Sequence, residues 1–205
     1  MAYSAIILAG GRGKRMGYTE KSMMVINGQP LITYVIKSLE NVVDEIIISV
    51  RDKTQGELLE PILPGYKYAY DEFENTGPLA GILSGLTLCK NEFCFIAACD
   101  MPFINEDVAK MLFSMVEGHD AAIPRWEDGF LEPLHAVYRC ETMIKETRKA
   151  IENGESIILA PIFRMNVNYI DIETIRKIDP NLRTFININT PEDMESITNT
   201  IGEIF

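Results

Sequence analysis

A glycine-rich, basic segment near the amino terminus holds the residue types best suited to chemistry. It runs from Leu8 to Gly17 with the sequence Leu-Ala-Gly-Gly-Arg-Gly-Lys-Arg-Met-Gly, and Lys21 follows. Glycines allow the backbone to approach phosphate oxygens and to turn its N–H groups toward them. Arginine and lysine add positive charge that the backbone cannot supply. The segment therefore predicts a phosphate-binding site, and the alternative is a flexible, solvated loop.

Two well-known nucleotide-binding loops do not fit this segment. The dinucleotide-binding spacing G-x-G-x-x-G is absent, and so is the Gly-Lys-Ser/Thr ending of a Walker A loop. The segment follows an apolar run at residues 3–9, which predicts a buried strand. It therefore leaves the carboxyl end of a strand, where open α/β sheets bind their ligands.

The charge balance narrows the possible partners. The formal net charge is −11, from 30 acidic and 19 basic residues. Such a chain is not expected to bind nucleic acid or an anionic membrane nonspecifically. Against this acidic background, the cluster of Arg12, Lys14, Arg15 and Lys21 favours a local anion site.

The cysteines and the absence of targeting segments indicate a cytoplasmic protein. Cys89, Cys94, Cys99 and Cys140 form no C-x-x-C pair and lie near no histidine cluster. We expect reduced cysteines that mostly pack in the core, and no zinc site. No signal peptide or membrane-spanning segment is visible.

Strand and helix patterns alternate along the 205 residues, which predicts one α/β domain over residues 1–205. The expected fold is a Rossmann-like three-layer sandwich with a mostly parallel sheet. The stretch 121–138, broken by Glu127-Asp128-Gly129, predicts a hairpin or an antiparallel strand. The expected strands are 3–9, 45–50, 67–70, 92–99, 165–170 and 184–188, and the expected helices are 30–40, 76–89, 105–117, 139–152 and one beginning at Thr190.

Six segments, in order along nearly the whole chain, resemble the molybdenum cofactor guanylyltransferase family of the nucleotidylyltransferase superfamily. Each segment alone occurs in many proteins, but all six in this order are specific to the family. The segments are the glycine loop, Asp71, 77–82 (Gly-Pro-Leu-Ala-Gly-Ile), 99–102 (Cys-Asp-Met-Pro), 133–138 (Pro-Leu-His-Ala-Val-Tyr) and 187–193 (Asn-Ile-Asn-Thr-Pro-Glu-Asp).

The resemblance implies three catalytic residues. Arg15 and Lys21 would contact the triphosphate, and Asp100 would hold Mg²⁺. Magnesium is commonly bound by one or two carboxylates together with substrate phosphates and water, so a single aspartate after a strand suits it. The alternative for Asp100 is a turn or capping residue before Pro102.

The resemblance also implies a nucleotide site and an acceptor side. Asp71 would accept hydrogen bonds from N1–H and the exocyclic amine of guanine, although an ordinary surface turn is the alternative. Small residues at Gly77 and Gly81 would leave space for the nucleoside. Asn187 and Asn189 would flank a strand end and reach the metal or the acceptor. The glycine loop would contribute Leu8, Ala9, Gly10 and Gly11 to nucleotide binding.

The implied activity is transfer of GMP from GTP to the phosphate of molybdopterin, with release of pyrophosphate and formation of a guanine dinucleotide. An acceptor phosphate is already anionic, so this reaction needs no strong base, and His119 and His135 are expected to be packing or hydrogen-bonding residues. The alternatives are an adenosylcobinamide-phosphate guanylyltransferase, a cytidylyl- or sugar-phosphate nucleotidylyltransferase, and a nucleotide-binding module without turnover. The oligomeric state stays open.

Three positions bear on the choice of base. Glu20 stands where the family commonly has aspartate, and Arg51 follows a strand that lacks an asparagine found in some members. Guanylyl members tend to have Leu-Ala-Gly-Gly, as here, and cytidylyl members Leu-Ala-Ala-Gly. We therefore expect Gly10 to lie in the wall of the base pocket, where a Cβ would take space that a purine needs.

Overall fold

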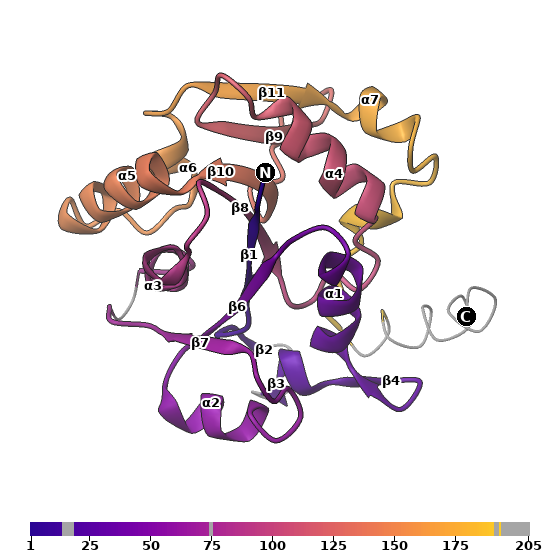
Figure 1. Cartoon of the computed structure of the whole chain (residues 1–205), viewed down its shortest axis with the longest axis vertical. Helices are drawn as coiled ribbons and strands as arrows, with labels where there is room; N and C mark the ends of the chain where they lie inside the picture. The colour runs from indigo at the N-terminus through magenta and orange to yellow at the C-terminus, as the bar shows by residue number, and fades with distance from the viewer. Residues whose placement is uncertain (14–18, 74–75, 191–192, 194–205) are drawn as a thin grey trace.

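A seven-stranded sheet forms the centre of the protein (Figure 1). The structure is a computed structural model and describes residues 1–13, 19–73, 76–190 and 193. Across the sheet the strands follow the order β11-β9-β10-β8-β1-β6-β7. Their bounds are β1 Ser4–Leu8, β6 Glu45–Val50, β7 Lys67–Tyr70, β8 Phe93–Ala98, β9 Ala121–Arg125, β10 His135–Arg139 and β11 Val167–Asp171.

The sheet is mostly parallel, as the sequence predicts. β1 pairs in parallel with both β6 and β8, and β7 and β11 are also parallel to their neighbours β6 and β9. β10 runs antiparallel to β8 on one side and β9 on the other, so the stretch 121–138 forms a pair of antiparallel strands. β1 is buried on both faces, which explains the apolar run that follows Ser4 in this strand.

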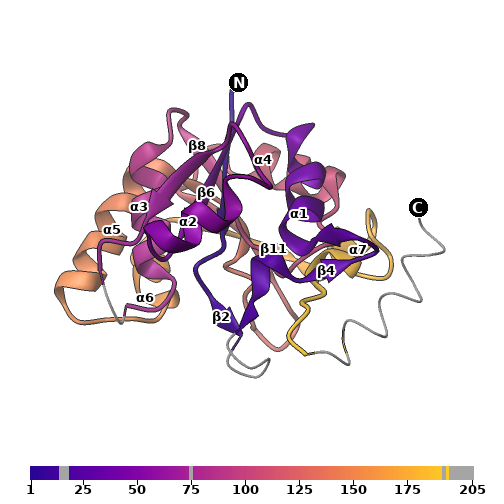
Figure 2. The same ribbon diagram turned by 90° about the horizontal axis from the view of Figure 1, so that it is seen from below.

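Helices cover both faces of the sheet and complete three layers (Figures 1 and 2). One core lies between the sheet and α1, α2, α4 and α7, and the other lies between the sheet and α3, α5 and α6. These two cores confirm the predicted sandwich. The helices are α1 Leu31–Glu40, α2 Lys53–Leu59, α3 Leu79–Leu88, α4 Glu106–Met115, α5 Cys140–Glu152, α6 Leu159–Ile162 and α7 Ile172–Arg176.

Small elements extend from the sandwich at the end of β1 and before α1. Two-residue strands form the pairs β2 Arg12–Gly13 with β3 Thr19–Glu20, and β4 Val25–Ile26 with β5 Gln29–Pro30. One turn of 3₁₀ helix, η2 at Lys21–Met23, separates the two pairs.

The prediction of a strand at 184–188 is wrong. Arg183–Phe185 is a turn of 3₁₀ helix, η3, and Ile186 continues in an extended conformation outside the sheet. The backbone N–H of buried Thr184 donates to Asp179 Oδ2 at 2.8 Å, so a side chain replaces a neighbouring strand. The helix expected at Thr190 begins with reciprocal hydrogen bonds between Thr190 and Asp193, but its remainder lies outside the described residues.

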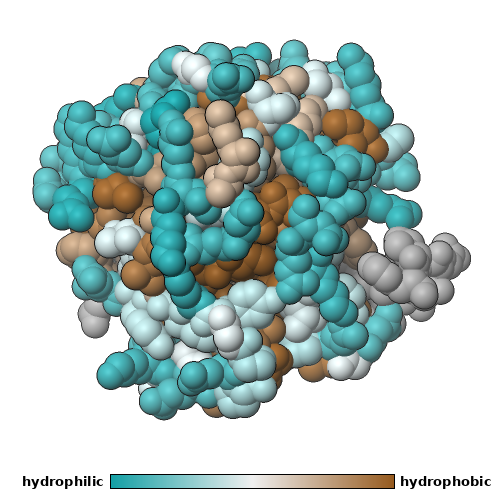
Figure 3. All heavy atoms as spheres, viewed as in Figure 1, coloured by the Kyte–Doolittle hydropathy of each residue, from teal (hydrophilic) through white to brown (hydrophobic). Residues whose placement is uncertain are grey.

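Most of the cysteines are buried, as expected of packing residues, and hydrophilic side chains dominate the surface in view. Figure 3 shows hydrophilic side chains over most of one face, with a hydrophobic hollow near its centre. Cys94, Cys99 and Cys140 are buried, as packing residues would be. Among the described helices, none has the length and apolar character needed to cross a membrane.

The amino-terminal cap of α4 gives a test of local stability. The Asn105 side chain accepts hydrogen bonds from the N–H groups of Asp107 at 2.9 Å and Val108 at 3.2 Å. Asn105→Ala should lower the free energy of unfolding by about 1 kcal/mol, measured by urea denaturation. Asn105→Asp keeps an acceptor and should stay near wild type, whereas equal losses in both variants would contradict the capping role.

Candidate active site

A cavity of about 390 Å³ opens at the carboxyl ends of the central strands, beside the start of α3. Figure 2 shows the amino terminus at the top and β2 at the bottom, on the side where β1 ends. This is the end of an open α/β sheet at which ligands bind. The lining residues are Leu8, Gly10, Gly11, Lys21, Ser49, Asp71, Gly77, Pro78, Gly81, Ala98, Cys99, Asp100 and Leu134.

Most of the residues singled out in the sequence meet at this cavity. Ala9 does not line it, because its side chain is buried in the core and its N–H donates to Ser49 O at 2.8 Å. Arg15 lies outside the described residues. Of the segment 133–138, Leu134 reaches the cavity. The fold therefore gathers the glycine loop, Lys21, Asp71, α3 and Asp100 around one space.

Lys21, Asp100 and Asn189 form a polar cluster at one end of the cavity. The Lys21 ammonium donates to Asp100 Oδ2 at 2.8 Å and to Asn189 Oδ1 at 2.7 Å. The Lys21 and Asp100 side chains are mostly buried, with 18% and 14% of their surfaces exposed. A carboxylate oxygen and an amide oxygen thus converge on one positive charge.

The donor set of this cluster suits magnesium. Both oxygens are hard ligands, and Mg²⁺ usually takes one or two carboxylates and completes its shell with phosphate and water. Among the described residues, no group of three or more His, Cys, Asp or Glu side chains could hold a metal alone. With one carboxylate and one amide oxygen, the cluster would leave the rest of a Mg²⁺ coordination shell to phosphate and water.

Of the two asparagines expected near the metal or acceptor, the structure brings Asn189 to the cluster. Asn187 is exposed, and no hydrogen bond of its side chain is recorded among the described residues. Between them, the N–H of Ile188 donates to Asp100 O at 2.9 Å and fixes the segment beside the end of β8.

Asp71 lies at another part of the cavity wall, directly after β7. Its Oδ1 is buried and has no hydrogen-bond partner among the described residues. Burial raises the pKa of this carboxyl to about 6. The ordinary surface turn considered for Asp71 therefore does not describe its environment, and the carboxylate has free acceptor capacity at the cavity.

Because Gly81 has no side chain, Asp71 and Ser49 can come close to α3. A Cβ at Gly81 would lie 2.6 Å from Ser49 Oγ and 3.4 Å from Asp71 Oδ1. Ser49 was not singled out from the sequence. Its signal is a polar residue near the end of an apolar strand, buried to 1% exposure at the cavity.

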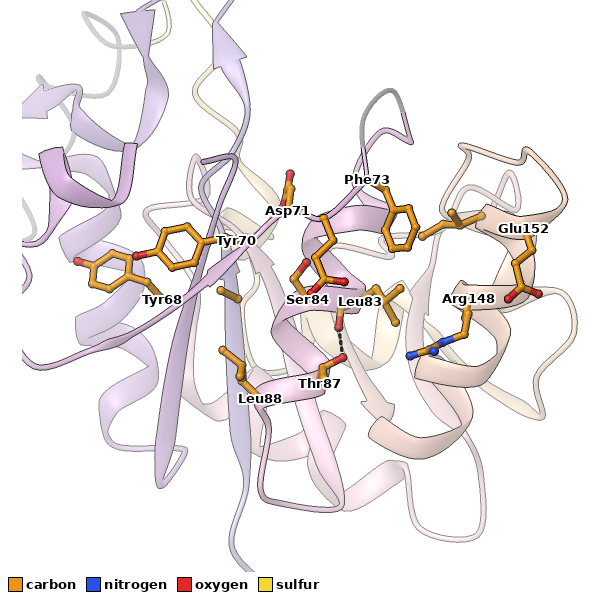
Figure 4. Close-up of a pocket in the computed structure, with 13 residues that line it drawn as sticks. Tyr68, Tyr70, Asp71, Phe73, Leu83, Ser84, Thr87, Leu88, Arg148 and Glu152 are labelled. Carbon is orange, nitrogen blue, oxygen red and sulfur yellow. Dashed lines mark hydrogen bonds between the residues drawn. The ribbon is translucent and has the colours of Figure 1, made fainter. Parts of the chain in front are cut away.

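A second cavity of about 500 Å³ borders Asp71 from the other side, between β7, α3 and α5. Its lining is mainly apolar and aromatic, including Phe73 and Leu88. Figure 4 shows Asp71 at the far end from Thr87 and Leu88. Apart from Asp71, no residue singled out from the sequence lines this cavity.

Two glycines of the cavity wall also lie close to neighbouring backbone. Gly77 adopts φ +58°, and a Cβ there would lie 2.7 Å from Ser156 O, so the position needs glycine for backbone conformation and loop packing. A Cβ at Gly10 would lie 3.2 Å from the backbone nitrogen of Arg51 and would point toward that backbone. The expectation that a Gly10 Cβ would take the space of a purine stays a prediction.

The two positions that depart from the family pattern are partners of each other. Arg51 Nη2 donates to Glu20 Oε1 at 2.8 Å. The second carboxylate oxygen of Glu20 accepts from Gln55 Nε2 at 2.8 Å. Gln55 was missed in the sequence, because nothing local marks a glutamine in a short helix as a buried residue.

Neither histidine lines the cavity. His135 is buried between Phe95 and Phe185, with ring centroids at 5.1 and 4.9 Å. Burial lowers the pKa of His135 to about 3, so the ring is neutral. His119 contacts the carbonyl of Glu117. Both are packing or hydrogen-bonding residues, as predicted.

The fold and the cavity together define a nucleotidyltransferase-type α/β protein, and comparison with known proteins narrows the class. The family described as "MobA-like NTP transferase domain" matches residues 5–164. The chain belongs to this family.

Relatives of similar length support the assignment. A "Probable molybdenum cofactor guanylyltransferase" of Methanosarcina mazei is 46% identical over 95% of this chain and 89% of the relative. A protein with the same name from Methanosarcina acetivorans is 45% identical over 98% of this chain and 92% of the relative. The crystal structure of "Molybdopterin-guanine dinucleotide biosynthesis protein A" from Archaeoglobus fulgidus is 33% identical, with a TM-score of 0.84 and coverage of 98% of this chain and 99% of that chain.

The raised pKa of Asp71 predicts a pH-dependent stability difference. A folded-state pKa of about 6, above the ordinary 3.8, means that the ionised carboxylate destabilises the fold above pH 6. This cost disappears below about pH 4, where the carboxyl is protonated in both the folded and unfolded states. The melting temperature of Asp71→Asn relative to wild type should therefore rise between pH 4 and pH 6. A difference that stays constant over this range would contradict the burial of Asp71.

Proposed function

We propose that this protein transfers GMP from GTP to the phosphate of molybdopterin, forming a guanine dinucleotide cofactor and releasing pyrophosphate. The observation that carries the proposal is the 2.8 Å contact between Lys21 and Asp100 in one cavity with the glycine loop and Asp71. Relatives that cover nearly the whole chain carry the guanylyltransferase name.

Charge sets the orientation of the nucleotide in the cavity. The phosphates belong beside Gly10, Gly11 and Lys21, where N–H groups and an ammonium are available. Arg15 is assigned to the triphosphate by the family resemblance. The base belongs beside Asp71, because a carboxylate repels phosphate and can accept two hydrogen bonds from guanine.

Asp100, with Asn189 beside it, is the group we assign to Mg²⁺. When bound, the cation would neutralise charge on the phosphate oxygens. Before ligands bind, the Lys21 ammonium balances the Asp100 carboxylate and holds the Asn189 side chain beside it.

The reaction is an in-line displacement at the α-phosphorus of GTP. An oxygen of the acceptor phosphate forms the new bond, and the bond from the α-phosphorus to the bridging oxygen breaks, with its electron pair leaving on pyrophosphate. The acceptor oxygen is already anionic, so no base must remove a proton. The chain contributes positioning through Gly10 and Gly11 and charge through Lys21.

The test is pyrophosphate release with Mg²⁺, molybdopterin and each nucleoside triphosphate in turn. We expect release with GTP and little with CTP or ATP. Release with CTP alone would make the protein a cytidylyltransferase. Binding of GTP without release would make it a nucleotide-binding module.

Asp100→Asn should reduce kcat/KM more than about 100-fold, because the amide keeps the shape of the side chain but removes its charge as a metal ligand. Pyrophosphate release at increasing Mg²⁺ measures the effect, and circular dichroism checks the fold. Asp107→Asn, on the exposed side of α4, is the matched control and should be unchanged. Near-normal activity of a folded Asp100→Asn protein would remove Asp100 from the metal site.

Lys21→Ala should weaken GTP binding about 10- to 100-fold and GMP binding much less, because the ammonium is assigned to the leaving phosphates. Calorimetry with the two nucleotides measures both affinities. Lys37→Ala is the control, since Lys37 donates to Gln29 on the exposed surface of α1. If GTP and GMP lose affinity equally, Lys21 does not contact the leaving phosphates.

A further inference from the structure

Two carbonyl groups of the glycine loop are held from one side by Arg51, directly after β6, and by Gln55 in the first turn of α2. Gln55 Nε2 donates to Ala9 O at 2.8 Å, and Arg51 Nη1 lies 3.5 Å from Gly10 O in a longer contact. Arg51 and Gln55 belong to a part of the chain that follows the loop by about forty residues. The successive carbonyls of Ala9 and Gly10 therefore both face the start of α2.

Gln55 is fully buried, and both ends of its amide are used. Its Nε2 donates to Ala9 O and to Glu20 Oε2, and its Oε1 accepts from the Arg51 N–H at 2.9 Å. Its own N–H is fixed by Asp52 Oδ1 at 2.9 Å, at the first turn of α2. A buried amide with three hydrogen bonds is held in one orientation, because turning it would leave buried groups unpaired.

Peptide geometry converts this anchoring into a direction for the loop amides. In a trans peptide unit the C=O and the following N–H point in opposite directions, and the described residues contain no cis peptide. Holding Ala9 O and Gly10 O toward α2 therefore turns the N–H groups of Gly10 and Gly11 away from α2. Both glycines line the cavity, and no hydrogen bond of either N–H is recorded in the described part of the chain.

The same network reaches the lysine of the cavity. Glu20 bonds to Arg51 and Gln55 at 2.8 Å each, and the next residue is Lys21, whose ammonium contacts Asp100. The cluster around buried Gln55 thus sets the direction of two loop amides and the start of the turn that carries the ammonium.

We propose that Gln55, supported by Glu20 and Arg51, is a positioning residue that aims the Gly10 and Gly11 N–H groups at the nucleotide phosphates. Gln55 touches no substrate and acts through the loop. This inference rests on the proposed function, since it assigns the phosphates to these two amides.

The test compares a phosphorylated ligand with its nucleoside. Gln55→Met keeps the length of the side chain but removes its hydrogen bonds. We expect the Kd of GTP to rise about 10- to 100-fold while that of guanosine changes less than about 3-fold. Glu57→Gln, on the exposed side of the same helix, is the control and should match wild type. A purely structural role would lower the melting temperature and weaken both ligands equally, and that result would overturn the proposal.

A second variant covers the case in which Gln55→Met does not fold. Glu20→Gln keeps the shape of a side chain that is 20% exposed and removes the charge that pairs with Arg51. We expect the same selective loss for GTP, about 3- to 10-fold. An unchanged ratio of GTP to guanosine affinity in folded Glu20→Gln would also overturn the proposal.

The wild-type protein separates failure of this inference from failure of the proposed function. If wild type binds GTP but releases no pyrophosphate with molybdopterin, the transferase function is wrong while the binding comparison still tests Gln55. If wild type prefers another triphosphate, that triphosphate and its nucleoside replace GTP and guanosine. If wild type binds no triphosphate, both proposals are wrong.

Discussion

The contact between the Lys21 ammonium and the Asp100 carboxylate is the interaction on which the site depends. It forms because β1 and β8 are neighbours and Leu8 is paired with Ala98. The glycine loop and Asp100 therefore leave adjacent strands at the same height, although about ninety residues separate them. The order of the strands, rather than any local motif, brings the glycine loop together with the carboxylate that we assign to Mg²⁺.

As a result of this arrangement, the two parts of the cavity wall differ in charge. N–H groups and an ammonium lie beside Asp100, whereas Asp71 presents a buried, unpartnered oxygen elsewhere on the wall. In a chain with a net charge of −11, this local concentration of positive groups favours binding of an anion at the cavity. A ligand with phosphates at one end and hydrogen-bond donors at the other matches both parts.

Local sequence predicted the elements well where packing and pattern agree. The bounds of β6 and β7 follow directly from β-branched and aromatic runs. The strand expected at 184–188 failed because alternating Ile and Asn resemble a strand, while Asp179 and Asn105 take up the hydrogen bonds around Thr184. Lys21, Asp71 and Asp100 were identifiable by type and by resemblance. Gln55 could not be identified in this way, because its contact with Ala9 spans 46 positions and forms only when the chain is folded. Its partners Glu20 and Arg51 were noted in the sequence only as departures from the family pattern.

The most direct test of the central claim is the mass of the product. The protein is incubated with GTP, Mg²⁺ and molybdopterin, and the reaction is separated and measured by mass spectrometry. The account predicts molybdopterin increased by one GMP unit, in equal amount to the pyrophosphate released. Unmodified molybdopterin after complete GTP binding, or a product carrying CMP when both nucleotides are supplied, would contradict it.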